Sequence, residues 1–200
     1  MSENLWVPGE IDTAEMFDAA FCPDPVPAGF PACMVYAGGS SASHPWTARE
    51  LALVAHLPRL PVWVPTPGTD NPRQAGLTFV AWLAANKVPA VAPNGEHTLV
   101  MWDLETGREP YPRWVNIACN VLKAHGYFNL IYGSIISGGI FGQPARSGYV
   151  VANPTGNPHL YDHPQVVATQ YADTVKVPGG TIDKSLFRRD LLDQLWQPAP

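Results

Sequence analysis

Two acidic side chains stand directly after a strongly apolar segment. Residues 98–102 read Thr-Leu-Val-Met-Trp, and Asp103 and Glu105 follow them. Alternate residues of a β-strand point to the same face, so Asp103 and Glu105 are predicted to project together, with Met101 behind them. Two carboxyl groups in unlike surroundings acquire different pKa values, which supplies an acid and a charged partner at neutral pH. The spacing therefore indicates acid–base chemistry. The alternative is that the strand ends before these residues and that both carboxylates are simply solvated.

Two further acids end apolar segments elsewhere in the chain. Asp12 closes the segment that begins at Leu5, and Asp183 closes the segment 179–182. Both are predicted to lie at the carboxyl ends of strands. Asp183 has a second interpretation, because an aspartate is also a preferred N-cap for a helix that would follow it.

The elements that must position these acids alternate between strand and helix patterns. Short apolar runs bounded by Gly, Pro or Asn predict strands, over residues 5–12, 32–37, 62–64, 98–103, 127–132, 148–152, 166–171 and 179–183. Helices are predicted from the Thr47/Glu50 capping box, from the Asn71-Pro72 start, from Pro112 to a C′ glycine at Gly126, and over a final stripe of Phe187, Leu191 and Leu195. Residues 13–20 have weak helical character.

This alternation predicts an α/β fold with a parallel sheet covered by helices. About eight strands fit a small (β/α)8 TIM-like barrel in a single domain over residues 1–197, followed by a short Pro-rich tail at 198–200. A doubly wound open sheet is the alternative. The acids favour the barrel, since only a barrel brings the carboxyl ends of the first and last strands together.

Composition narrows the function classes. A net charge of −5 argues against nucleic acid as a partner, because binding phosphates requires a basic face.

No segment resembles a signal peptide or approaches the length of a membrane span. Cys22, Cys33 and Cys119 lack metal-site spacing, and we expect Cys33 and Cys119 to be buried thiols. Neither a metal nor another cofactor is predicted.

The sequence resembles a known family, the glycoside-hydrolase-like domain of actinobacterial wall proteins and their phages. That domain is related to the family 25 muramidases. The matching pieces run in order along nearly the whole chain. They are Gly9–Asp12, Met34–Gly39, Pro61–Pro65, Val100–Glu105, Leu130–Ser134, Ala168–Tyr171 and the pair Ile182-Asp183.

The resemblance implies a role for each matched residue. Glu105 corresponds to the catalytic acid of the muramidases, and Asp103 to the aspartate that assists it. Asp12 and Asp183 correspond to the opening and closing aspartates, which hold the sugar or the attacking group. The side chains of Tyr132, Gln170 and Tyr171 would line the cleft. Apart from the resemblance, an exposed Trp63 would offer the face of its ring to a sugar.

Two functions stay open on the sequence. The first is hydrolysis of peptidoglycan, a cell-wall polysaccharide. The second is a non-catalytic component of a phage tail, a minor tail protein, that keeps the barrel and binds glycan or other tail proteins. The closing motif Asp183-Lys184-Ser185 motivates the second, because Lys184 near the cleft would hold a catalytic acid ionised. Such a component is expected to be a homo-oligomer in the virion, or cytoplasmic before release.

Overall fold

The computed structural model describes residues 5–6, 11–42, 44–105, 111–134, 139–144 and 147–198. The strands are β1 (Leu5–Trp6), β2 (Thr13–Asp18), β3 (Ala32–Gly38), β4 (Arg59–Trp63), β5 (Leu99–Asp103), β6 (Phe128–Ser134), β7 (Gly148–Ala152), β8 (Leu160–Tyr161), β9 (Val166–Val177) and β10 (Gly180–Arg188). The helices are α1 (Ala48–Leu53), α2 (Pro72–Ala85) and α3 (Pro112–Ala124), with 3-10 turns η1 (Ile140–Gly142) and η2 (Arg189–Gln194).

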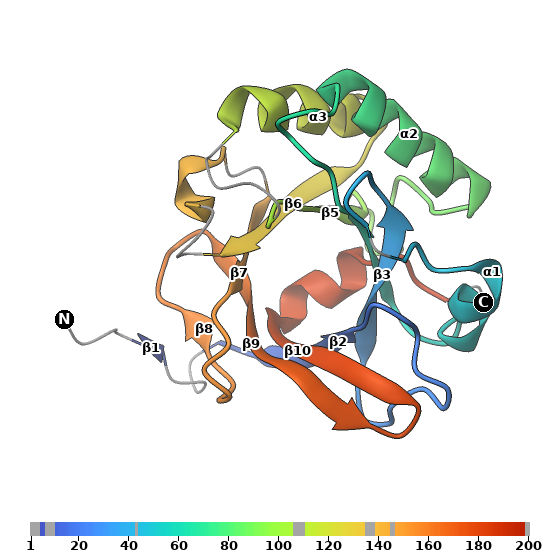
Figure 1. Cartoon of the computed structure of the whole chain (residues 1–200), viewed down its shortest axis with the longest axis vertical. Helices are drawn as coiled ribbons and strands as arrows, with labels where there is room; N and C mark the ends of the chain where they lie inside the picture. Colours follow the sequence, from blue (N-terminus) through green and yellow to red (C-terminus); the bar gives the residue numbers. More distant parts are fainter. Residues whose placement is uncertain are drawn as a thin grey trace.

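Eight strands close a barrel in the order β10-β2-β3-β4-β5-β6-β7-β9 (Figure 1). The predicted closed barrel is therefore confirmed, and the open sheet is excluded. The barrel strands β2, β3, β4, β5, β6, β7 and β9 pair in parallel, but β10 is antiparallel to both of its neighbours. This mixed barrel, with three α-helices in the described residues, is not the regular (β/α)8 repeat that the sequence predicted. The short strands β1 and β8 pair outside the barrel.

Local helix signals are realised as predicted. Thr47 and Glu50 form the capping box of α1, and the Asn71 side chain accepts a hydrogen bond from the Gln74 N–H (3.0 Å) at the start of α2. Gly126 follows the last turn of α3 with φ +85°, a left-handed conformation that glycine adopts without strain. These signals act within a few residues, so the tertiary structure does not need to support them.

The weak helix predicted over residues 13–20 is wrong, because residues 13–18 form strand β2. Of the strand predicted over residues 5–12, Leu5–Trp6 form β1, residues 7–10 lie outside the described residues, and Ile11 and Asp12 are not in a strand. Met16 and Phe17 are both fully buried, on opposite faces of β2. A segment that is buried on both faces has no clear period, so its sequence does not distinguish strand from helix.

The predicted final helix is also wrong. Residues 180–188 continue as β10, and η2 follows it. Phe187 therefore does not share a helix face with Leu191; it lies in the barrel interior, fully buried. Pairing of β10 with both β2 and β9 closes the barrel, and this long-range requirement overrides the local helical pattern.

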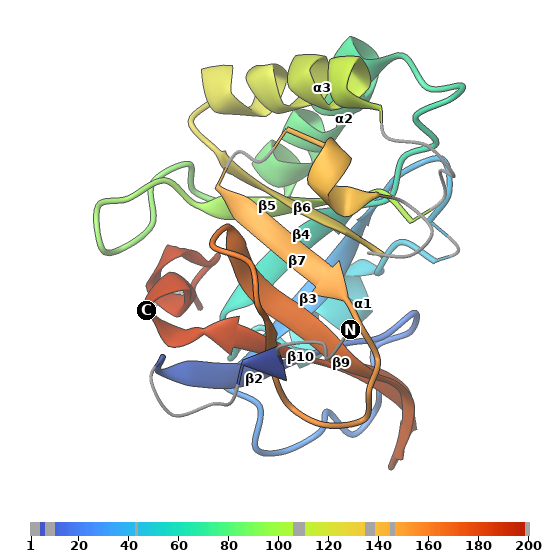
Figure 2. The same ribbon diagram turned by 90° about the vertical axis from the view of Figure 1, so that its left-hand side faces the viewer.

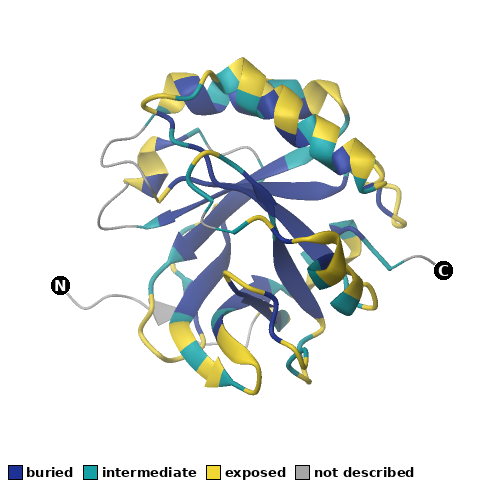
Figure 3. Cartoon of the chain, turned by 45° about the vertical axis from the view of Figure 1, so that its right-hand side comes forward, coloured by how far each residue is buried: buried dark blue, intermediate teal, exposed yellow. Residues whose placement is uncertain are grey.

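Two apolar layers hold the barrel. The interior layer is made by alternate strand residues such as Met16, Met34, Leu60, Met101, Leu130 and Phe187. The outer layer lies between the barrel and the helices, and Trp102 is at its centre. The centroid of the Trp102 ring lies 5.5 Å from that of Phe79 and 5.4 Å from that of Trp114, and both contacts are edge to face. Figure 2 shows α2 and α3 side by side over β5 and β6, and Figure 3 shows their exposed outer faces over the buried strands.

Candidate active site

Four carboxyl groups meet at one end of the barrel. Asp18 and Asp103 are the last residues of β2 and β5, and Glu105 follows two residues after Asp103. Because β10 is antiparallel, its amino-terminal half lies at the same end, and Asp183 is directly opposite Asp18 in the ladder. The four acids line a cavity of about 270 Å³. The other lining residues are Ala20, Tyr36, Ser41, Ala42, His44 and Val64.

Asp12 is not part of this cluster. It precedes β2 and so lies at the opposite end of the barrel, where its Oδ1 accepts a hydrogen bond from Arg189 Nε at 2.8 Å in an exposed ion pair. The place predicted for Asp12 is taken by Asp18, which the sequence reasoning missed. The signal was present, because Met16-Phe17-Asp18 is another junction between an apolar pair and an acid.

Asp18 and Asp103 are the deeper pair. Asp18 is 5% exposed, and burial raises its pKa well above the ordinary value, helped by the charges of Asp183, Asp103 and Glu105. Asp103 is 7% exposed, and burial together with the Glu105 charge raises its pKa to about 7. The Glu105 N–H donates to Asp103 Oδ1 at 3.1 Å and partly opposes that rise. A buried cluster of like charges resists full ionisation, which favours the protonated forms of Asp18 and Asp103.

Glu105 and Asp183 are the more accessible pair. Glu105 is exposed as a residue, but the cavity removes part of the water around its carboxyl group and raises its pKa. A hydrogen bond with Tyr132 acts in the opposite direction. Burial also raises the pKa of Asp183, whereas hydrogen bonds from the Thr174 N–H (2.7 Å) and the Gln170 side chain favour its charged form.

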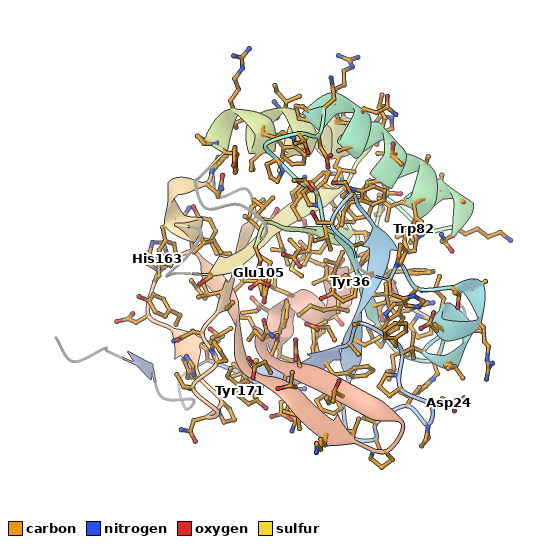
Figure 4. All side chains as sticks on the ribbon, viewed as in Figure 1. Asp24, Tyr36, Trp82, Glu105, His163 and Tyr171 are labelled. Carbon is orange, nitrogen blue, oxygen red and sulfur yellow. The ribbon has the colours of Figure 1, made fainter. Side chains whose placement is uncertain are left out.

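Polar side chains connect these two acids. Tyr132 is aligned with Asp103 in the β5–β6 ladder, and its hydroxyl donates to Gln170 Oε1. Tyr36 lies on β3, next to the strand that ends in Asp18, and the charge of Asp18 is the main cause that raises the pKa of its hydroxyl. Figure 4 labels Tyr36 and Glu105 near the middle of the barrel. Tyr132 and Gln170 thus lie beside Glu105 and Asp183 but are not among the residues that line the cavity, whereas Tyr36 is a lining residue that the sequence reasoning missed.

Tyr171 and Trp63 do not line the cavity. Tyr171 is 3% exposed on the outer face of β9, where its hydroxyl donates to Glu15. Trp63 packs beneath α2, 5.2 Å from the Phe79 ring. Tyr171 is adjacent to the inward-facing Gln170, and Trp63 is adjacent to the inward-facing Val64. Because successive side chains of a strand alternate between its two faces, both point outward. The predicted sugar-binding roles of both are therefore wrong in position.

Trp102 and Lys184 adjoin the acids in the sequence, but their side chains point away from them. Trp102 belongs to the outer layer, where its Nε1 donates to Asn129 Oδ1 at 2.9 Å, so it does not surround Glu105. Lys184 alternates with Asp183 along β10 and places its Nζ 5.5 Å from the Phe30 ring centroid. The expected pairing of Lys184 with a catalytic acid is therefore not found in the described residues.

An aromatic pair at the mouth of the cavity was not anticipated. His44 lines the cavity, its Nε2 lies 3.0 Å from Glu50 Oε2, and its ring stacks on Phe21 at 4.1 Å. Phe21 is 63% exposed. An exposed aromatic face beside a polar cavity is suited to contact with the apolar face of a sugar ring.

Across the described ranges, no group of three or more His, Cys, Asp or Glu side chains is arranged to hold a metal ion. No helix there has the length and apolarity needed to cross a membrane.

Comparison with known proteins bears on this geometry. No family model matches the sequence, and no curated protein matches it. Solved structures do match. A family GH25 lysozyme from Aspergillus fumigatus superposes with a TM-score of 0.59 at 15% identity, over 93% of this chain and 100% of the lysozyme. The fold is that of the GH25 lysozymes.

Two other similar structures agree with that fold. A Tat-secreted protein of Mycobacterium tuberculosis, solved in complex with L-tartrate, has a TM-score of 0.61 at 15% identity, over 94% of this chain and 100% of that one. The CTP1L endolysin has a TM-score of 0.59 at 13% identity, over 90% of this chain and 68% of the endolysin. The resemblance inferred from the sequence is thus confirmed at the level of the fold.

Proposed function

We propose that this protein binds and hydrolyses a bacterial cell-wall glycan of the peptidoglycan type. The observation that carries the proposal is the gathering of Asp18, Asp103, Glu105 and Asp183 around one cavity with raised pKa values. Glycoside hydrolysis needs one carboxyl group that is protonated near neutral pH and another that is charged. Lysozyme, muramidase and endolysin structures share the fold, which supports a wall glycan as the substrate.

The positions of the acids suggest their roles. Glu105 is the most accessible, and its raised pKa favours the protonated form that donates to the glycosidic oxygen. As that C–O bond breaks, positive charge develops at the sugar carbon, which a nearby carboxylate stabilises. Asp183 has two hydrogen-bond donors that favour its charged form, so it is the candidate carboxylate. Water completes the reaction by adding its oxygen to the sugar carbon and returning a proton to Glu105.

Asp103 lines the same cavity and acts through Glu105 in this scheme. Its Oδ1 accepts the Glu105 N–H, which fixes the turn that carries Glu105 beyond the strand. Asp18, the least exposed of the four acids, also lines the cavity and adds to the like charge of the cluster.

The test is release of reducing ends from purified peptidoglycan by the wild type, Glu105→Gln and Asp12→Asn. The wild type should release them, and Glu105→Gln should lower the rate by about a hundredfold or more, the usual size of a general-acid contribution. Asp12→Asn is the matched control, because it makes the same carboxyl-to-amide change at the opposite end of the barrel. It should retain full activity.

Failure of the wild type to release reducing ends would overturn the proposal of hydrolysis. Retained binding of peptidoglycan by that inactive protein would then favour the non-catalytic alternative. A place in a phage tail, with copies of this chain or other tail proteins as partners, stays a prediction. Detection of the protein in purified virions would test it.

A further inference from the structure

A second cavity lies at the end of the barrel opposite the four acids. It has a volume of about 650 Å³ and sits between the start of β4, the residues after α2 and the C-terminal segment. Arg59, Lys87 and Asn86 supply its polar wall, and Val91, Trp196 and Gln197 belong to the remaining lining. No aspartate or glutamate is among the described residues that line it.

Arg59 is the unusual member of this cavity. It is the first residue of β4 and is 5% exposed. Its guanidinium carbon lies over the Trp196 ring, 3.6 Å from the ring centroid. Backbone hydrogen bonds in both directions, at 2.9 and 3.0 Å, hold Trp196 against Arg59. The guanidinium is therefore fixed in place before any ligand arrives.

The hydrogen-bonding capacity of this guanidinium is largely unused. Its Nη2 donates to the Gln197 carbonyl at 3.3 Å, and its buried Nε has no partner in the described structure. Within the described residues no carboxylate forms an ion pair with Arg59. A buried cation without a counter-ion is costly, because the charge has lost water without gaining an acceptor. The contact with the Trp196 ring does not use the N–H groups of Arg59, so the unpaired ones are available for such an acceptor.

We propose that this cavity binds a small ligand that carries a carboxylate or phosphate group. The planar fork of arginine matches both oxyanions in bidentate geometry. Lys87, exposed at the rim with φ +56°, adds a second positive charge. The cavity is thus a positively charged region on a chain whose net charge is −5. The site is separate from the four acids and does not depend on the proposed hydrolysis.

The experiment is an NMR titration of the full chain that follows the indole N–H of Trp196, assigned with Trp196→Phe. The probes are inorganic phosphate, acetate, N-acetylmuramic acid and N-acetylglucosamine, all at constant ionic strength, which suppresses non-specific screening effects. The two sugars differ by one carboxylate-bearing group, so they form a matched pair. Tighter binding of phosphate than of acetate would identify the ligand as a phosphate. A shift of the Trp196 signal with N-acetylmuramic acid but not with N-acetylglucosamine would identify it as a carboxylated sugar.

Binding should weaken by on the order of tenfold or more in Arg59→Gln, because a charge-assisted bidentate contact is lost. Since Arg59 is buried and its replacement can disturb folding, Lys87→Gln is the second variant, and Lys176→Gln is its control on the distant β9–β10 hairpin. Lys87→Gln should weaken binding several-fold, and Lys176→Gln should leave it unchanged. The proposal is overturned if none of the three anions shifts the Trp196 signal. It is equally overturned if Lys87→Gln and Lys176→Gln behave alike.

Discussion

Tyr132 is the residue that joins the two accessible acids of the site. Its hydroxyl has one proton, which can be donated either to Gln170 or to Glu105. Gln170 in turn hydrogen-bonds Asp183. When Glu105 becomes charged it is the stronger acceptor, so the Tyr132 proton favours the ionised form of Glu105. The acidity of the proposed proton donor is therefore set partly by a phenol.

Replacement of Tyr132 by phenylalanine should raise the pKa of Glu105. Loss of the hydroxyl removes a hydrogen bond that stabilises the charged form, so Glu105 keeps its proton to higher pH. Because the general acid must be protonated, the alkaline limb of the pH–kcat profile for peptidoglycan should move to higher pH.

The control for that variant is Tyr127→Phe, which removes a phenol that donates to the Val88 carbonyl at 2.9 Å, away from the cavity. It should leave the alkaline limb in place. An alkaline limb that moves to lower pH in Tyr132→Phe would contradict the assigned effect on Glu105.

At the scale of elements, Glu50 connects helix α1 to the segment that carries the cavity mouth. Its Oε2 accepts from the Thr47 N–H at 2.8 Å and contacts His44 Nε2, and its Oε1 accepts from the Cys22 N–H at 3.1 Å. Partial burial alone would raise its pKa, but the hydrogen bonds from Thr47, His44 and Cys22 prevail and lower the pKa to about 2. One carboxylate thus caps a helix and orients His44.

Glu50→Gln should lower the free energy of unfolding by roughly 1–2 kcal/mol at pH 7. The folded pKa lies below the unfolded value, so this stabilisation is present above about pH 4.5 and is lost as the pH falls toward 2. Urea denaturation of both proteins at pH 7 and pH 3 measures the difference, which should shrink at pH 3.

Glu96→Gln is the control for Glu50, because Glu96 is exposed in a turn. Its effect should stay within about 0.5 kcal/mol. A Glu50→Gln protein as stable as the wild type at pH 7 would show that these hydrogen bonds contribute no net stability.

For the whole molecule, gathering four acids in one cavity opposes folding. Burial raises the pKa of Asp103 to about 7, so the folded protein binds more protons than the unfolded chain between about pH 4 and 7. Stability conferred by protonation is therefore present at low pH and falls as the pH rises through this range. The barrel retains the cluster despite that cost, and the proposed hydrolysis would require such a group of acids.

Asp103→Asn should be more stable than the wild type at pH 8, by about 2–4 kcal/mol, because it removes a carboxyl that must ionise in a buried place. The new amide oxygen can still accept the Glu105 N–H. The difference should vanish below about pH 4, where the wild-type carboxyl is protonated in both states. Urea denaturation from pH 4 to 8 measures it, with exposed Asp12→Asn expected to change stability by less than about 1 kcal/mol throughout. An Asp103→Asn protein that is less stable than the wild type at pH 8 would contradict a destabilising role for the buried carboxyl.

The sequence by itself determined the features that act over a few residues. The Thr47/Glu50 box, the Asn71-Pro72 start and Gly126 defined helix ends, because capping depends on side chains adjacent to the backbone groups they satisfy. The Asp103/Glu105 pair was also local, since a strand followed by a tight turn places both carboxyls at one barrel end.

Only the tertiary structure decided which other residues join that pair. Successive side chains of a strand point alternately into and out of the barrel, so a shift of one residue reverses the direction of each. Trp63 and Tyr171 are buried on the outer side, and their residue type does not reveal that they point outward. Asp18 replaced Asp12 because β2 begins where the sequence predicted a strand to end. Asp183 reached the site because β10 closes the barrel in the antiparallel direction. Strand order and direction arise from pairing between segments distant along the chain, and no local pattern encodes them.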